Sequence, residues 1–400
     1  MHCKIIKLSM ITSLLLVGCS SDDIAIEDSS PTSDVEIVET PDPTPTPTAE
    51  ELLEEKIETW LNSHSIEEKV AQMFIIRPDD LVGVSPVTIA SDVTKQAIQQ
   101  YPVGGLIYFS QNLVNWDQTT SMLSNTKQYY EELGYLEPFL SVDEEGGAVA
   151  RIGNAGTYGV ETFDPMWYIG QTGDTSQAAY VGTTVGTYLS QLGFNLDFAP
   201  DADVLTNPDN QVIGTRSFSS NPNVVSSMVD AEVKAMEATG VTPVIKHFPG
   251  HGGTLGDTHE GYAYTDKNLD QLLQSELVPF QNEIENGIQM IMVAHISVPN
   301  VIGDNTPSSL SYYMVSEVLR EQLGYDGVVI TDGMNMGAIS NSYDSATAAV
   351  KAIQAGVDII LMPQDFHSAY QGILDSIQSG TLTEDRINES LYRILKLKMQ

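Results

Sequence analysis

A repeated alternation of short apolar runs and longer amphipathic segments constrains the fold of this chain more than any other feature of the sequence. The runs are rich in Val, Ile, Leu, Met or Phe, and most lack alternating polar residues, which is typical of parallel strands covered on both faces. Eight such runs are present, at Gln72–Ile76, Gly105–Phe109, Pro138–Val142, Asn195–Ala199, Pro243–Lys246, Met290–Ala294, Gly327–Thr331 and Asp358–Met362. The sequence therefore predicts a parallel sheet of buried strands.

The segments between the runs have the periodicity of helices. Two sets of apolar residues are each expected to line one helix face: Leu269, Leu272, Leu273 and Leu277, and then Ile387, Leu391, Ile394 and Leu395. Left-handed helix ends are expected at Gly134, Gly193, Gly240, Gly287, Gly324, Gly356 and Gly380. Eight strand–helix units in about 350 residues predict an α/β fold, a TIM-like (β/α)8 barrel with long loops. A doubly wound open sheet is the alternative; no G-x-G-x-x-G follows the first run, which argues against a dinucleotide-binding sheet.

The start of the chain has the form of a bacterial secretion signal. Lys4 and Lys7 form a positively charged region directly before the mostly apolar stretch 8–17. At ten residues, this stretch is too short for a permanent membrane span. Leu16-Val17-Gly18-Cys19 resembles the lipobox of bacterial lipoproteins, in which the Cys is acylated after cleavage. An ordinary signal with an incidental Cys19 is the alternative. We expect Cys19 to be the lipidation site.

A different composition follows the signal. Residues 20–50 contain nine acidic residues, no Lys or Arg, and a Pro/Thr run at 41–47, which is typical of an extended tether. We therefore expect a signal peptide over 1–18, a lipidated Cys and linker over 19–50, and one folded catalytic domain over 51–400. This organisation predicts an exported protein, lipid-anchored to a bacterial membrane and facing the exterior or the periplasm.

Composition excludes several classes of protein. The chain has 18 Lys and Arg against 54 Asp and Glu, a formal charge of −36, so its surface repels phosphate backbones and nucleic acid is not an expected partner. The hydrophobic content of 42% is that of a globular chain with a substantial core. Both cysteines lie within the first nineteen residues, so the folded domain can form no disulfide.

Ionisable residues follow nearly every apolar run. They are Arg77, Asp143-Glu144-Glu145, Asp201, Asp203, Lys246-His247, His295 and Asp332. Active sites of (β/α)8 barrels are built where the strands end at their carboxyl side. The sequence therefore predicts one active site at that end of the barrel.

The loop after the fifth run, Lys246 to Gly261, contains three of the seven histidines and is rich in glycine, which permits tight folding. Asp257-x-His259 could place a carboxylate against one imidazole nitrogen and leave the other free for proton transfer. Two other interpretations stay open. His247 and His251 could be scaffold histidines, or the two could join Asp257 and His259 as metal ligands, although no H-x-H or H-E-x-x-H spacing occurs.

The seventh run, Gly327–Thr331, ends in the single carboxylate of Asp332. A carboxylate at the end of a buried strand is poorly explained as a surface charge. Together with a proton donor on the fifth-strand loop, it supplies the minimum set for retaining glycoside cleavage, namely a nucleophile and an acid/base.

Four sequence patterns resemble glycoside hydrolase family 3, specifically its bacterial β-N-acetylglucosaminidase branch. K-H-F-P-G-H-G…D-x-H matches Lys246 to His259, and G-V-x-x-[ST]-D-x-x-x-M matches Gly327 to Met336. D-x-E-G-G-x-V-x-R matches Asp143 to Arg151, and N-P-x-N-x-V-I-G-x-R-S-F matches Asn207 to Phe218. The resemblance covers nearly all of residues 51–400.

The resemblance implies a role for each matched residue. Asp332 would be the nucleophile, His259 the acid/base and Asp257 its partner. The terminal N-acetylglucosamine would be held by Asp143, Arg151, Arg216, Lys246 and His247. The implied activity is an exo-acting retaining β-N-acetylglucosaminidase that removes terminal N-acetylhexosamine from cell-wall or other glycans, without cofactor or metal. A β-glucosidase-like relative and a metal-dependent barrel hydrolase are the alternatives.

Overall fold

The computed structural model describes residues 47–400. The expected signal peptide, the lipidation site Cys19 and the linker up to residue 46 lie outside the described residues. Residues Thr48–Gln400 form one compact unit, which begins with α1 (Ala49–Ser63), capped by reciprocal hydrogen bonds between Thr48 and Glu51. Over the described range, no helix combines the length and apolar character that crossing a membrane would need.

Eight parallel strands form a barrel in the order in which they follow one another along the chain. They are β1 (Phe74–Ile76), β2 (Gly105–Ile107), β3 (Phe139–Val142), β6 (Leu196–Asp197), β7 (Thr242–Phe248), β8 (Met290–Val293), β9 (Val328–Thr331) and β10 (Ile360–Leu361). β10 pairs with β1, and a parallel bridge between Ile330 and Ile359 joins the last two strands. Seven of the eight predicted runs contain one of these strands, and the eighth, Pro243–Lys246, lies within β7. The predicted TIM-like barrel is therefore confirmed and the open sheet is not observed.

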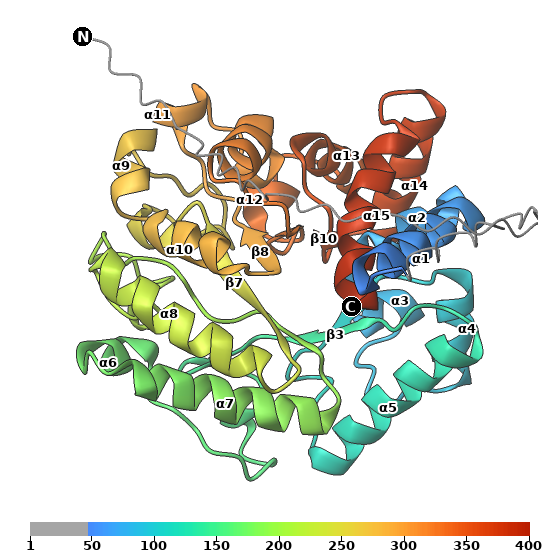
Figure 1. Cartoon of the computed structure of the whole chain (residues 1–400), viewed down its shortest axis with the longest axis horizontal. Helices are drawn as coiled ribbons and strands as arrows, with labels where there is room; N and C mark the ends of the chain where they lie inside the picture. The colour runs from blue at the N-terminus through green and yellow to red at the C-terminus, as the bar shows by residue number, and fades with distance from the viewer. Residues whose placement is uncertain (1–46) are drawn as a thin grey trace, which may run out of the picture. The chain divides into compact units, whose positions relative to one another are not determined.

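Helices surround the strands (Figure 1). After α1 they are α2 (Ile66–Gln72), α3 (Pro78–Val82), α4 (Asp92–Gln100), α5 (Trp116–Glu132), α6 (Met166–Gln171), α7 (Thr175–Leu192), α8 (Pro222–Glu237), α9 (Leu269–Gln274), α10 (Val278–Asn286), α11 (Pro299–Ile302), the π-helix η5 (Tyr313–Gln322), α12 (Gly337–Ser340), α13 (Ser345–Ala355), α14 (Phe366–Gln378) and α15 (Glu384–Met399). α1 packs against α15, and α2 packs against α14 and α15, so the first and last helices lie side by side.

The helix predictions are mostly confirmed. All seven predicted glycine stops have positive φ, between 74° and 110°, which only glycine adopts without steric cost. Apolar residues of α15 face the core as expected: Ile387, Leu391, Ile394 and Leu395 are fully buried. The prediction of one continuous helix face through Leu277 was wrong, because α9 ends at Gln274 and Leu277 immediately precedes α10. Pro279 lies in the first turn of α10, where a missing amide costs no helical hydrogen bond.

The barrel strands are buried on both faces, as their sequences predict. Phe74, Ile75 and Ile76 of β1 are all fully buried, although successive side chains of a strand point in opposite directions. Burying an aliphatic side chain of this size contributes about 1.5–3 kcal/mol. This rigid wall holds the residues that follow each strand at fixed positions.

Candidate active site

One pocket of about 690 Å³ lies where the strands end at their carboxyl side. Its wall contains all eight residues to which the family resemblance gives a catalytic or sugar-binding role: Asp143, Arg151, Arg216, Lys246, His247, Asp257, His259 and Asp332. Of the other ionisable residues at strand ends, Arg77, Glu144, Asp201, Asp203 and His295 do not line it. The eight lining residues come from four separate strand-end segments. The fold therefore gathers the set that the resemblance implies into one cavity.

Asp332 immediately follows β9 and is fixed by backbone contacts. Its amide donates to the carbonyl of Val293 at 2.9 Å, and the Gly333 amide donates to its Oδ1 at 2.7 Å. Burial would raise the pKa of Asp332, but His247, His295 and the Gly333 amide outweigh it, so the pKa lies below its usual value. Asp332 is therefore an ionised carboxylate at neutral pH and is able to act as a nucleophile.

His295 contacts the backbone directly after Asp332. It is buried, and its ring nitrogens contact Ser309 Oγ at 2.7 Å and the Gly333 carbonyl at 3.0 Å. The carbonyl can only accept, so Nε2 carries the proton in that contact. His295 thus fixes the loop directly after Asp332 and does not line the pocket itself.

Asp257 and His259 form a dyad on the loop after β7. Asp257 Oδ1 accepts hydrogen bonds from the His259 amide at 2.9 Å and lies 2.8 Å from His259 Nδ1. Burial raises the pKa of Asp257, but the hydrogen bonds from His259 outweigh it and bring the pKa below its usual value. The His259 side chain is 64% exposed, so Nε2 is left to exchange a proton with a bound ligand.

Glu145 joins two of the predicted sugar-binding cations. Its carboxylate accepts from Arg216 Nε at 2.9 Å and Nη2 at 2.7 Å, and lies 2.6 Å from Lys246 Nζ. Glu145 and Lys246 are each 2% exposed. Burial raises the pKa of Glu145, but the two cations outweigh it and hold the pKa well below its usual range. The three side chains therefore form a charged, buried bracket.

Asp143 continues this bracket towards the hairpin of β4 (Glu144–Gly146) and β5 (Val149–Ala150). Its carboxylate lies 3.1 Å from Lys246 Nζ and 3.5 Å from Arg151 Nη2. Glu144 points the other way and accepts from the amides of Ile152 and Gly153 at 2.8 and 2.7 Å, which holds the hairpin in place. Because β4 and β5 have only three and two residues, they show no periodic pattern and were not predicted from the sequence.

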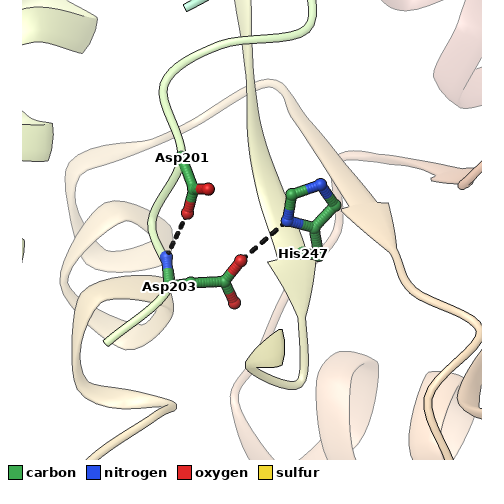
Figure 2. Close-up of side chains that lie close together, drawn as sticks. All are labelled: Asp201, Asp203 and His247. Atoms are coloured by element: carbon green, nitrogen blue, oxygen red, sulfur yellow. Dashed lines mark hydrogen bonds and ion pairs between the residues drawn. The ribbon is translucent and has the colours of Figure 1, made fainter. Parts of the chain in front are cut away.

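Asp203, which does not line the pocket, orients His247 (Figure 2). His247 Nδ1 lies 2.7 Å from Asp203 Oδ2, and His247 Nε2 lies 3.3 Å from Arg216 Nη2. Because a guanidinium can only donate, Nε2 accepts and Nδ1 carries the proton. Burial and the Arg216 charge lower the pKa of His247 to about 4. His247 is therefore neutral near pH 7, with a defined tautomer.

Asp201, Asp203 and His247 are the one group within residues 47–400 with metal-ligand spacing. Most of their polar atoms already have partners: the Asp203 amide donates to Asp201 Oδ1 at 2.9 Å, and His247 contacts Asp203. Asp201 Oδ2 makes no hydrogen bond to the described part of the chain, and Arg216 Nε lies 3.5 Å from it. Burial and the neighbouring Asp203 raise the pKa of Asp201 to about 8, which leaves it neutral near pH 7. A guanidinium beside a neutral acid is a poor place for a metal cation. The alternative metal set shares only His247 with this group.

His251 is a scaffold residue. It is buried, and its two ring nitrogens contact Thr254 Oγ1 at 2.8 Å and Thr258 Oγ1 at 3.1 Å. Its amide also donates to Asp203. A Cβ added to the neighbouring Gly252 would lie 2.3 Å from the carbonyl oxygen of Val204. The glycines of this loop therefore permit close packing against the protein itself.

Sequence reasoning missed the roles of Glu145 and Asp203. Both were visible as acidic residues after strands, and Glu145 is also the fixed Glu of the D-x-E-G-G pattern, but no role was predicted for either residue. The pocket wall also contains residues without an ionisable group that no pattern singles out, among them Asn335 and Met362.

Comparisons with known proteins agree with this geometry. Residues 65–397 match the glycosyl hydrolase family 3 N-terminal domain. The chain is 36% identical over 328 residues to β-hexosaminidase A of Pseudoalteromonas piscicida, which covers 76% of this chain and 54% of that protein. It is 32% identical over 344 residues to β-hexosaminidase LpqI of Mycobacterium tuberculosis, which covers 83% of this chain and 82% of that protein.

A solved structure is also similar. The glycoside hydrolase family 3 β-N-acetylglucosaminidase from Paenibacillus sp. str. FPU-7 superposes with a TM-score of 0.79 at 34% identity, covering 84% of this chain and 62% of that one. The chain thus spans about half the length of the first relative and about three fifths of this structure. The match over nearly the whole folded domain confirms what the four motifs predict: this chain belongs to glycoside hydrolase family 3.

Proposed function

We propose that the chain is an exo-acting retaining β-N-acetylglucosaminidase that releases terminal β-linked N-acetylhexosamine from glycans. The observation that carries the proposal is the shared pocket of an ionised Asp332 and the Asp257–His259 dyad. The names of the relatives, β-hexosaminidase and β-N-acetylglucosaminidase, support the substrate class. An ionised carboxylate and a proton-transfer group are the two parts that retaining glycoside cleavage requires.

In the first step, a carboxylate oxygen of Asp332 attacks the anomeric carbon of the terminal sugar. The bond from that carbon to the glycosidic oxygen breaks, and its electron pair leaves with the aglycone. His259 donates the proton on Nε2 to the departing oxygen. Asp257 remains ionised beside Nδ1, so it stabilises the positive charge of the protonated imidazole before transfer.

In the second step, His259 acts as a base. Its neutral Nε2 takes a proton from water, the water oxygen attacks the anomeric carbon, and the bond to Asp332 breaks. The β configuration is restored because the carbon is inverted twice. Asp257 again stabilises the imidazolium that forms.

Four other residues that line the pocket suit the binding of a sugar ring. Lys246 and Arg216 supply donors and Asp143 supplies an acceptor, while His247 Nε2 accepts from Arg216 and orients that guanidinium. Burial lowers the pKa of Lys246, but Glu145 and Asp143 outweigh it and raise the pKa above its usual value, so the ammonium stays charged. We assign the binding of the terminal sugar hydroxyls to these residues and to Arg151.

His259→Ala tests the mechanism through the leaving group. A dinitrophenolate leaves with little protonation, so the variant should lose much less glycosylation rate on a dinitrophenyl glycoside than on a disaccharide, where acid help is worth ~10²–10⁴-fold. Deglycosylation should slow for every substrate, and azide should restore it by attacking without a base. His367→Ala is the matched control, because His367 is exposed on α14 and does not line the pocket. Equal losses on all substrates without azide rescue would contradict the assignment.

A panel of chromogenic glycosides separates the substrate classes. The proposal predicts that an N-acetyl-β-glucosaminide is cleaved faster than the corresponding β-glucoside. The reverse order would favour the β-glucosidase-like alternative.

The proposed location rests on the N-terminal sequence. A lipidated Cys19 after an export signal would hold the enzyme at a bacterial membrane, facing the exterior or the periplasm, where cell-wall glycans are within reach. Cys19→Ser should move the protein from the membrane to the soluble fraction without changing activity per molecule. Continued membrane association of the variant would contradict the anchor.

A further inference from the structure

The dyad loop rests on the segment that follows the nucleophile. The loop tip, residues 257–260, receives backbone hydrogen bonds from the first turn of α12. The Gly337 amide donates to the His259 carbonyl at 3.1 Å, and the Ala338 amide donates to the Thr258 carbonyl at 3.0 Å. Asn341 Nδ2 adds a bond to the Glu260 carbonyl at 3.3 Å.

Gly337 marks the point of closest approach. A Cβ at this position would lie 2.8 Å from the carbonyl oxygens of His259 and Glu260. Real Cβ atoms essentially never come this close to backbone, so a side chain here would push the tip away from α12. The φ of Gly337 is not positive, so close approach, and not backbone conformation, explains the glycine.

The tip has one further side-chain contact, between the buried Thr258 Oγ1 and His251 Nε2 at 3.1 Å. The base of the tip is closed by the reciprocal backbone pair of Leu255 and Tyr264, at 2.8 and 3.0 Å. Within this loop, the amides of Glu260 and Gly261 donate to the Asp257 carbonyl at 3.1 and 3.0 Å and close the turn. In the part of the chain that the structure describes, the backbone bonds that reach the tip from outside its hairpin come from Gly337 and Ala338 alone.

We propose that Gly337 is a positioning residue, which sets the distance of His259 from Asp332 by letting the loop tip dock on α12. Asp332 lies five residues before Gly337 in the same strand-end loop, so one short segment carries the nucleophile and supports the acid/base. This inference rests on the proposed roles of Asp332 and His259. A misplacement of about 1 Å can cost about 10²-fold in rate.

Gly337→Ala should therefore impair the steps that need His259 and spare those that do not. We expect about 10- to 100-fold slower turnover of a disaccharide and slower deglycosylation, with rescue by azide. Glycosylation by a dinitrophenyl glycoside, measured as the pre-steady-state burst, should stay near the parent value. Asn341→Ala, which removes one side-chain bond, should show a weaker form of the same pattern.

Gly261→Ala is the matched control. It is the same change in the same hairpin at a glycine without positive φ, but its Cβ would meet only Asn341 Nδ2, at 3.9 Å. Parent-like kinetics of this control are expected. The proposal is overturned if Gly337→Ala keeps parent kinetics, or if it loses the dinitrophenyl burst as fully as disaccharide turnover, since Gly337 would then serve the fold or the nucleophile. Thermal unfolding of both variants identifies a general loss of fold.

The His259→Ala variant separates the failure of this inference from the failure of the proposed function. If His259→Ala shows no dependence on the leaving group, the acid/base assignment itself fails. If His259→Ala behaves as expected and Gly337→Ala does not follow it, only the docking role of Gly337 fails.

Discussion

Replacing Glu145 by Gln tests whether the buried bracket is an electrostatic unit. The substitution keeps the shape of the side chain and one acceptor oxygen but removes the negative charge. Arg216 and Lys246 would then both contact a neutral amide in place of the carboxylate, which lies 2.6 to 2.9 Å from their nitrogens in the parent. Arg216 stays charged, because an arginine remains protonated in proteins, and Lys246 keeps one carboxylate partner, Asp143, at 3.1 Å.

The expected destabilisation follows from the burial of the group. The Glu145 side chain is 2% exposed, so water cannot replace the lost charge. Removing one partner of a buried ion pair costs about 3–5 kcal/mol, because an uncompensated charge is left behind. Asp143 offsets part of this on the Lys246 side, at 3.1 Å. We therefore expect the lower part of that range for the free energy of unfolding at pH 7, about 3 kcal/mol.

The effect should also depend on pH with a defined sign. The folded-state pKa of Glu145 is depressed, since its cations outweigh burial. The stability that its charge contributes is therefore present above the pKa of the unfolded chain, about 4.3, and is lost as the pH falls below it. Linkage predicts that the gap between parent and variant narrows by about 0.6 kcal/mol from pH 7 to pH 4.

Urea unfolding of the parent, Glu145→Gln and Glu321→Gln measures these differences. Glu321 is exposed in η5, so its substitution controls for the loss of one carboxylate from a highly acidic protein. A loss below about 1 kcal/mol for Glu145→Gln, or a loss equal to that of the control, would refute the bracket as a buried ionic unit.

Two further predictions concern the neighbouring group of Asp201, Asp203 and His247. Asp203→Asn should lower kcat/KM by about 5- to 150-fold, the equivalent of about 1–3 kcal/mol, because the His247 ring and the His251 amide would then compete for the one amide oxygen. An unchanged kcat/KM would show that the orientation of His247 does not matter. Treatment with a chelator should leave hydrolysis unchanged, since Asp201, Asp203 and His247 are already engaged with each other and with Arg216; a loss that Zn²⁺ restores would favour the metal-dependent alternative.

The fold could be predicted because the strands are buried on both faces. Most of their apolar runs lack alternating polar residues, and glycine stops mark the helix ends independently of the runs. The break between α9 and α10 was missed because Leu269 to Leu277 keeps a helical period across it. Pro279 was the available signal, since a proline in the interior of a helix removes a hydrogen bond and marks a new first turn.

The sequence predicts which residues line the site but not which side chains pair with one another. Strand ends converge in a barrel, so residues such as Lys246 and Asp332 could be placed in one cavity from their positions alone. Which carboxylate pairs with which cation depends on side-chain directions that the sequence does not encode locally. Asp143, Glu144 and Glu145 are adjacent acids, yet Glu144 binds backbone amides while Glu145 binds Arg216 and Lys246.

Identification of the covalently labelled residue tests the central claim most directly. A slow fluorosugar analogue of N-acetylglucosamine should form a stable glycosyl-enzyme, detected as a mass increase of the intact protein. Proteolysis and mass spectrometry should place the sugar on Asp332, and Asp332→Ala should neither turn over substrate nor become labelled while keeping its fold. A sugar attached to a different carboxylate, with Asp332→Ala still active, would contradict the account.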